Sequence, residues 1–172
     1  EIAIEDFVKE PARIESVQNG IKRKKFEKRY GQGYEVALAE SELLERYIPM
    51  SHKWRGGNLF RVINMSNEEA HDLLEHAEAG REFSFDVTTM WTVRGALKDA
   101  ELEKTVQAGE VPVVFVWKNA KTGAPVTYLF PASADMVLAS ANMILMPKKA
   151  YSMQDGVVFI ECKEESDAGS NV

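Results

Sequence analysis

Hydrophobic and polar positions along the chain recur with two periods, one typical of helices and one typical of strands. The clearest helical repeat has apolar residues at spacings of three and four: Ala70, Leu73, Leu74 and Ala77. Ser66 and Glu69 precede it with the spacing of a capping box, and Gly80 follows it as a typical C-terminal stop. The pattern therefore predicts a helix between residues 66 and 80.

Alternation of apolar and polar residues predicts strands elsewhere. In the run 83–93, apolar or β-branched residues occupy every second position, which is typical of a long antiparallel strand with one buried face. Shorter runs predict six further strands, at 34–38, 59–65, 111–117, 125–130, 143–146 and 157–162. The third and fourth of these flank a five-residue loop, 119–123, so we expect them to form a hairpin.

The first thirty residues are more polar and predict a surface helix over 13–30, with Ile14, Val17 and Ile21 as its apolar stripe. Shorter helical runs lie at 41–47 and near 97–106. The expected fold is an α+β domain: a curved, mostly antiparallel sheet of six to seven strands with two to three helices, and the N-terminal basic helix as an appendage. The predicted organisation is a helical segment 1–33, an α+β domain 34–162 and a disordered acidic tail 163–172.

Composition narrows the class of protein. Of the 172 residues 45% are hydrophobic and 28% are charged, which are ordinary values for a globular chain. No run approaches the roughly 18 apolar residues of a membrane-spanning helix. The single cysteine, Cys162, excludes an intrachain disulfide and any multi-cysteine metal site. Its apolar neighbours favour a packed core thiol over a nucleophile.

Charge is distributed unevenly. Six cations and one acid give residues 22–29 a charge of +5, which leaves −11 on the rest of a chain whose net charge is −6. The six are Lys22, Arg23, Lys24, Lys25, Lys28 and Arg29. Such a segment is either a solvent-exposed helix whose cations are attracted to the acidic rest of the chain, or a helix that faces an anionic partner. No aromatic residues interleave with the cations to stack bases, so nucleic acid is an alternative that the pattern does not favour.

A second exposed candidate is Trp54, with Arg55 beside it in a polar, glycine-containing loop. A tryptophan in such a loop either folds back onto the core or contacts a partner. No sequence-local catalytic motif is present: there is no G-x-S-x-G elbow, Walker A sequence or dinucleotide fingerprint. The leading interpretation is a non-catalytic binding or assembly module without a cofactor, which contacts a protein or an anionic surface through the basic helix 21–30 and the Trp54 loop.

Enzymatic alternatives remain open at this point. His71 and Glu75 share a helix face and supply two metal ligands if His52 joins them in space. Asp86 and Asp135 are the strand-associated aspartates that a small hydrolase needs as a carboxylate pair. A purely structural subunit is a third class. Because the chain starts at Glu1, we expect a processed or truncated N-terminus, which leans towards an extracytoplasmic location.

Overall fold

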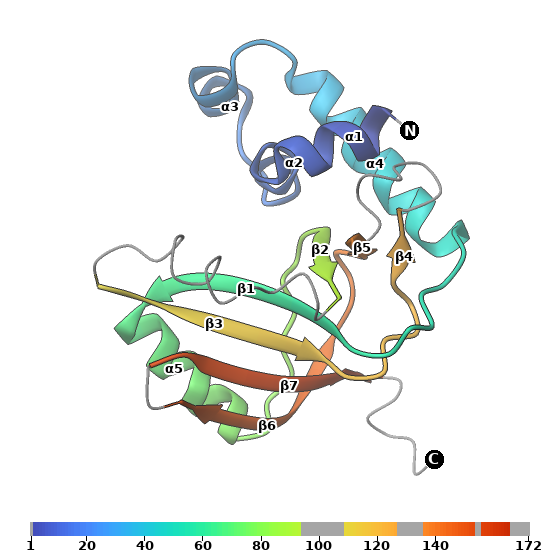
Figure 1. The fold of residues 1–172 in the computed structure, drawn as a ribbon. Coiled ribbons are helices and arrows are strands. Elements are labelled where there is room, and N and C mark those ends of the chain that lie inside the picture. Colours follow the sequence, from blue (N-terminus) through green and yellow to red (C-terminus); the bar gives the residue numbers. More distant parts are fainter. Residues whose placement is uncertain (1, 94–108, 127–135, 154–155, 166–172) are drawn as a thin grey trace. The chain divides into compact units, whose positions relative to one another are not determined.

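A computed structural model of the protein describes residues 2–93, 109–126, 136–153 and 156–165 (Figure 1). These residues form five helices and a curled, mixed seven-stranded sheet with strand order β4-β5-β2-β1-β3-β7-β6. The helices are α1 (Ile2–Lys9), α2 (Pro11–Gln18), α3 (Arg23–Tyr30), α4 (Tyr34–Met50) and α5 (Asn67–Glu78). The strands are β1 (Leu59–Ser66), β2 (Thr89–Thr92), β3 (Glu110–Trp117), β4 (Ala124–Pro125), β5 (Met136–Ala139), β6 (Leu145–Ser152) and β7 (Val158–Glu164).

The expected α+β class with a curved sheet is therefore confirmed. Two details differ from the expectation, because the described part has five helices instead of two to three and because β3 and β7 are parallel. None of the described helices is both long enough and apolar enough to cross a membrane. The helix expected near 97–106, and residues 127–130 of one expected strand, lie outside the described residues.

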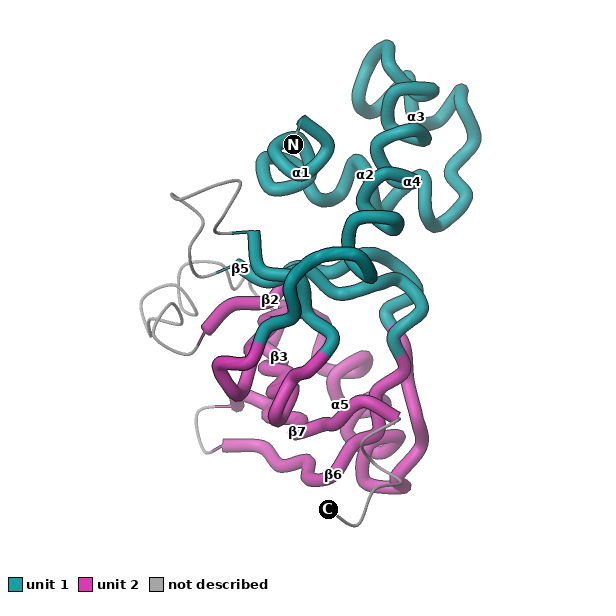
Figure 2. Tube along the Cα trace, turned by 90° about the vertical axis from the view of Figure 1, so that its right-hand side faces the viewer, with its two compact units in different colours: residues 1–54, 85–90, 122–143 teal, residues 55–84, 91–121, 144–172 magenta. Residues whose placement is uncertain are grey.

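The chain divides into two compact units whose segments alternate along the sequence (Figure 2). Unit 1 comprises residues 1–54, 85–90 and 122–143, and unit 2 comprises residues 55–84, 91–121 and 144–172. Unit 1 contains α1 to α4, and unit 2 contains α5 with strands β1, β3, β6 and β7. The two units are described separately below.

In unit 1, the predicted helix over 13–30 is two helices, because the chain turns at Gly20. This residue has φ +81°, a left-handed conformation that glycine adopts without strain, and its N–H donates to the carbonyl of Val17. After the turn, α3 directs its single buried residue, Phe26, into the core of unit 1. The basic run thus belongs to a separate eight-residue helix.

The strand expected at 34–38 is wrong, since these residues open helix α4. The buried positions of α4 are Ala37, Glu40, Leu44 and Ile48, which have the spacing of one helix face. Val36 and Leu38, which suggested alternation, are exposed. Glu40 interrupts the apolar stripe, so the helical repeat is not evident in the first half of α4. The helical run expected at 41–47 is confirmed as part of α4, and Pro49 lies in its last turn.

Glu40 is buried because Arg13 of α2 neutralises it. Nη1 of Arg13 donates to Oε2 of Glu40 at 3.0 Å, and the two side chains are 16% and 7% exposed. The guanidinium also lies 5.9 Å from the centre of the Phe26 ring. Burial and a hydrogen bond shared with Asp6 raise the pKa of Glu40, while Arg13 acts to lower it. This ion pair links α2 to α4 across 27 residues of sequence.

In unit 2, strand β3 has a hydrogen-bonded neighbour on each edge. It pairs antiparallel with β1 from Leu59 opposite Trp117 to Ser66 opposite Glu110, and parallel with β7 from Val113 to Trp117. The hairpin expected between 111–117 and 125–130 is therefore wrong, because both edges of β3 are occupied and β4 pairs with β5. Strand β7 continues to Glu164, whose carboxylate accepts a hydrogen bond from the N–H of Lys121.

The long strand expected at 83–93 is limited to Thr89–Thr92. Asp86 has φ +58°, which is incompatible with a strand. Side chains of unit 1 hold the next residues: the amide of Gln18 bonds both the N–H and the hydroxyl of Thr88, and Glu45 accepts from the same hydroxyl at 2.8 Å. At Thr88, these hydrogen bonds to side chains stand in place of the strand-to-strand hydrogen bonds that the apolar–polar alternation predicts.

The predicted helix at 66–80 is confirmed as α5, and its cap is testable. Oγ of Ser66 accepts the N–H of Glu69 at 3.1 Å. We predict that Ser66→Ala lowers the free energy of unfolding by about 1 kcal/mol, since one N–H of the first turn loses its acceptor. Urea denaturation followed by circular dichroism measures the change. Ser66→Asp should retain most of the stability, and an Ala variant as stable as wild type would contradict the cap.

The Arg13–Glu40 pair predicts a pH-dependent loss of stability. Because the pKa of Glu40 is raised, its carboxyl contributes stability in full below pH 4.5, and this contribution is lost as the pH rises through the folded-state pKa. Arg13→Leu removes the group that lowers this pKa, so we expect a loss of about 3 kcal/mol at pH 8 and a smaller one near pH 5. Urea denaturation at both pH values, with exposed Arg46→Leu as control, measures it. An equal loss at both pH values would contradict the prediction.

Candidate functional site

The basic run lies exposed on and before α3. Arg23 forms an ion pair with Glu35 of α4, and both side chains are largely exposed. The other five cations form no ion pair within the part of the chain that the structure describes: Lys22, Lys24, Lys25, Lys28 and Arg29. Their role as a partner-binding surface stays a prediction.

The other two predicted contact residues, Trp54 and Arg55, belong to different units. Trp54 is half-buried in unit 1, and its backbone N–H donates to the carbonyl of Gly123 at 2.8 Å. Arg55, the next residue, is exposed and belongs to unit 2. The role of Trp54 and Arg55 as partner contacts stays a prediction.

The alternative metal site is not formed by the described residues. Nε2 of His71 lies 3.1 Å from Oε1 of Glu75, as helical spacing predicts, but both side chains are about two thirds exposed. His52 is exposed in the other unit. No group of three or more His, Cys, Asp or Glu residues in the described ranges has metal-binding geometry. Of the aspartates considered for a hydrolase, Asp86 is in a turn and Asp135 lies outside those ranges.

Cys162 is a packed core thiol, as its apolar neighbours indicate. It is fully buried on β7, and its Sγ contacts the carbonyl oxygen of Val116 at 3.4 Å. Burial, together with the negative charge of Glu161, raises the pKa of this thiol to about 12. A thiol that stays protonated near neutral pH is not a nucleophile.

Sequence reasoning missed Arg61, which lies on β1 near the middle of the sheet. Arg61 is half-buried with its Nε atom buried, and it lies opposite Phe115 of β3. On the other edge of β1, Phe60 pairs with Thr92, which places Trp91 of β2 opposite Arg61. Trp91 is fully buried and packs edge-on against Trp117 at 5.3 Å between ring centres. A lone arginine within the apolar run 59–65 was the sequence signal.

Because opposed residues of a sheet share a face, Arg61 lies on one face of unit 2 with Trp91 and Phe115. An arginine there is a permanent cation with a planar fork of donors, which binds phosphate or carboxylate oxygens in pairs. Low-polarity surroundings strengthen such an interaction. Among the described residues, this arginine is the best candidate for holding an anionic group within unit 2.

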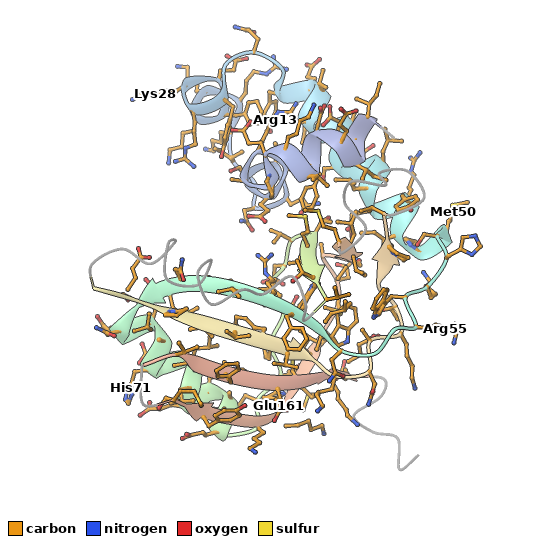
Figure 3. All side chains as sticks on the ribbon, in the orientation of Figure 1. Arg13, Lys28, Met50, Arg55, His71 and Glu161 are labelled. Carbon is orange, nitrogen blue, oxygen red and sulfur yellow. The ribbon has the colours of Figure 1, made fainter. Side chains whose placement is uncertain are left out.

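A half-buried acid, Glu161, lies on the opposite face of the sheet. It follows Ile160, which shares the face of Phe115, and its carboxylate lies 3.5 Å from Nζ of Lys118. Beside it on that face, the rings of Tyr151 and Phe159 stack at 5.4 Å. Arg61 and Glu161 therefore do not converge on one site, and Figure 3 labels Glu161 on β7.

Comparison with known proteins bears on the fold. No protein-family model and no curated protein sequence matches the chain. Among solved structures, the ADP-ribosyltransferase Vis of Vibrio splendidus in complex with agmatine is similar with a TM-score of 0.70 and 16% identity, over 99% of this chain and 76% of that one. The Clostridium limosum C3 exoenzyme is similar with a TM-score of 0.61 and 12% identity, over 95% and 83%.

Exoenzyme S from Pseudomonas aeruginosa, solved with human 14-3-3 protein beta and carba-NAD, is similar with a TM-score of 0.56 and 11% identity, over 99% of this chain and 76% of that one. Identities this low show the fold, which is that of ADP-ribosyltransferases. The interpretation as a non-catalytic binding module is therefore wrong, since the structures that share this fold are enzymes. The error came from treating the absence of a sequence-local motif as evidence against an enzyme.

The burial of Cys162 gives a test of the sheet that carries Arg61. We predict that Cys162 in the native protein does not react with a disulfide reagent at pH 8, because its pKa of about 12 keeps it protonated and its side chain is fully buried. Denaturation should expose one thiol per chain. Absorbance of the released thiolate measures both states, and Leu43→Cys, at an exposed position, is the reactive control. Fast native labelling of Cys162 would contradict this packing.

Proposed function

We propose that the chain is an enzyme that transfers the ADP-ribose group of NAD to an acceptor. The observation that carries the proposal is the similarity, over nearly the whole described fold, to several solved ADP-ribosyltransferases. The half-buried Arg61 supports it independently, because NAD contains a pyrophosphate that needs a cation or clustered donors.

NAD supplies a ribose whose bond to a positively charged nicotinamide is already weak. On transfer, the C1′–N bond breaks with its electron pair going to the nicotinamide nitrogen, and the acceptor atom bonds to C1′ and loses a proton. The chain has to hold the dinucleotide, limit the access of water and orient the acceptor.

The residues around Arg61 fit an anionic, partly aromatic substrate. The guanidinium of Arg61 binds and orients a phosphate through two N–H donors. Trp91, Phe115 and Trp117 lie on the same face of the sheet as Arg61, and their buried rings make that face apolar. Because β1 is hydrogen bonded on both edges, the backbone that carries the guanidinium is held rigidly.

The acceptor class is suggested by the solved relatives. The structure of Vis contains agmatine, a guanidino compound, and exoenzyme S was solved with a protein partner. We propose that the acceptor of this chain is a protein, and that agmatine is a suitable small probe for a guanidino acceptor. This replaces the earlier expectation of a passive protein contact with a protein that the chain modifies.

The proposal predicts that the purified chain releases nicotinamide from NAD, faster with agmatine present. Arg61→Ala should lower kcat/KM for NAD at least about tenfold, since a charge-assisted contact contributes about 1.5–3 kcal/mol. Arg61→Lys should recover part of the loss, because lysine keeps the charge without the fork. Chromatography of nicotinamide and mass spectrometry of agmatine measure the reaction.

Arg81→Ala is the matched control, because Arg81 is an exposed arginine of the same unit and is not on β1. Its activity should equal that of wild type. Failure of the wild-type chain to bind NAD by calorimetry would overturn the proposed function. Equal losses in Arg61→Ala and Arg81→Ala would keep the activity but remove Arg61 from the site.

A further inference from the structure

Unit 1 contains a surface hollow that the proposed activity does not use. It has a volume of about 600 Å³ and lies where α2 ends and α3 begins. Four cations line it, together with an amide side chain and a glycine: Lys22, Lys24, Lys25, Arg29, Asn19 and Gly20. No acidic residue lines the hollow. Four of the six cations of the basic run therefore face one concave surface.

The start of α3 adds backbone donors to the same place. The first intrahelical bond runs from the N–H of Phe26 to the carbonyl of Lys22, so the preceding N–H groups have no acceptor in the helix. Lys22 at the N-cap provides no side-chain acceptor, and the first turn contains no acid. The partial positive charge of the helix end thus adds to the lysine charges instead of offsetting them.

Core contacts hold the walls of the hollow in place. Phe26 is fully buried and packs against Tyr30 at 5.1 Å and Tyr34 at 5.4 Å between ring centres. The hydroxyl of Tyr30 lies 3.2 Å from the hydroxyl of Ser16 on α2, and Tyr34 donates to the carbonyl of Ile21. The cations are therefore brought together by the fold before any ligand arrives, which reduces the entropy lost on binding.

None of the residues that the structure describes fills this position. A Cβ added at Gly20 would meet no atom within 4 Å, so the glycine borders open space. The four lining cations form no ion pair with the described residues. Neighbouring like charges destabilise a folded protein, and a bound anion relieves this repulsion.

We infer that this hollow is a binding site for a ligand with two or more linked or adjacent phosphate groups. Four cations balance such a group, whereas a single phosphate carries a charge of only about −1.5 to −2. The volume is in the range of small-ligand sites, about 300–1,000 Å³. NAD, whose pyrophosphate is partly balanced by its own cationic ring, matches the charge poorly. A soluble polyphosphate and a polyphosphorylated lipid headgroup both present this chemistry.

Inorganic tripolyphosphate and the full chain provide the first test. We expect saturable 1:1 binding by calorimetry, with an affinity that falls as salt rises. Lys25→Gln should weaken binding about five- to tenfold, and Lys28→Gln should change it less than twofold. Both substitutions remove one charge from the exposed face of α3, but only Lys25 lines the hollow. Figure 3 labels Lys28 on α3.

Vesicles distinguish the two sources of the ligand. The two kinds of vesicle contain either phosphatidylinositol bisphosphate or phosphatidylserine and are matched in surface charge. Binding to the first kind and not to the second would assign the site to a lipid headgroup. Binding of tripolyphosphate without either vesicle would assign it to a soluble ligand. Both results support the inference if Lys25→Gln weakens them about five- to tenfold and Lys28→Gln changes them less than twofold.

Three results would overturn it. The first is no binding of tripolyphosphate or of either vesicle. The second is a diffuse electrostatic surface. It would be shown by equal weakening of tripolyphosphate binding in Lys25→Gln and Lys28→Gln, or by a short RNA that binds more tightly than tripolyphosphate and depends on both lysines. The third is displacement of tripolyphosphate by an equal concentration of NAD, which would make the hollow part of the substrate site.

Discussion

The double pairing of β3 is the constraint on which unit 2 depends. With β1 antiparallel on one edge and β7 parallel on the other, both backbone edges of β3 are satisfied within the sheet. Its residues from Val113 to Trp117 are accordingly buried. The same registers decide which face Arg61 shares and why Cys162 is inaccessible. A one-residue shift would move Arg61 to the other face and disrupt the aromatic packing.

Unit 1 depends on a different interaction, the buried ion pair between Arg13 and Glu40. A buried carboxylate needs a partner, and Arg13 provides it while its guanidinium also contacts the ring of Phe26. Phe26 in turn anchors α3, so the position of the basic hollow follows from the same group of residues. Phe26 thus connects the buried Arg13–Glu40 ion pair to the exposed cations of α3.

The fold is supported by comparison with solved structures, whereas the proposed site rests on the residues of this chain. The fold is that of ADP-ribosyltransferases, although the identities of 11–16% leave the site residues to be argued from this chain alone. The role that we propose for Arg61 rests on its being a cation on a doubly paired strand. The role that we infer for the hollow is separate, since its cations lie on and before α3 in the other unit.

Local patterns were sufficient where neighbouring residues decide the structure. The capped helix α5 and strands β1, β3 and β7 were predictable, because an N-cap or an uninterrupted apolar run acts over a few residues. Only residues 41–47 of helix α4 were predicted as helical, and its first half was not, because its buried Glu40 is paired with Arg13, 27 residues away. The true start of the strand expected at 83–93 was not predictable either, since Gln18 hydrogen bonds to Thr88 from 70 residues away.

The site shows the same division. Sequence alone determined that the cations gather at residues 22–29 and that no contiguous catalytic motif exists. Only the tertiary structure decided that four of these cations face one hollow, and that Arg61 lies among aromatic residues from two other strands. The physical reason is that charge density is a property of neighbouring residues, whereas burial, register and convergence arise from contacts between residues far apart in the chain.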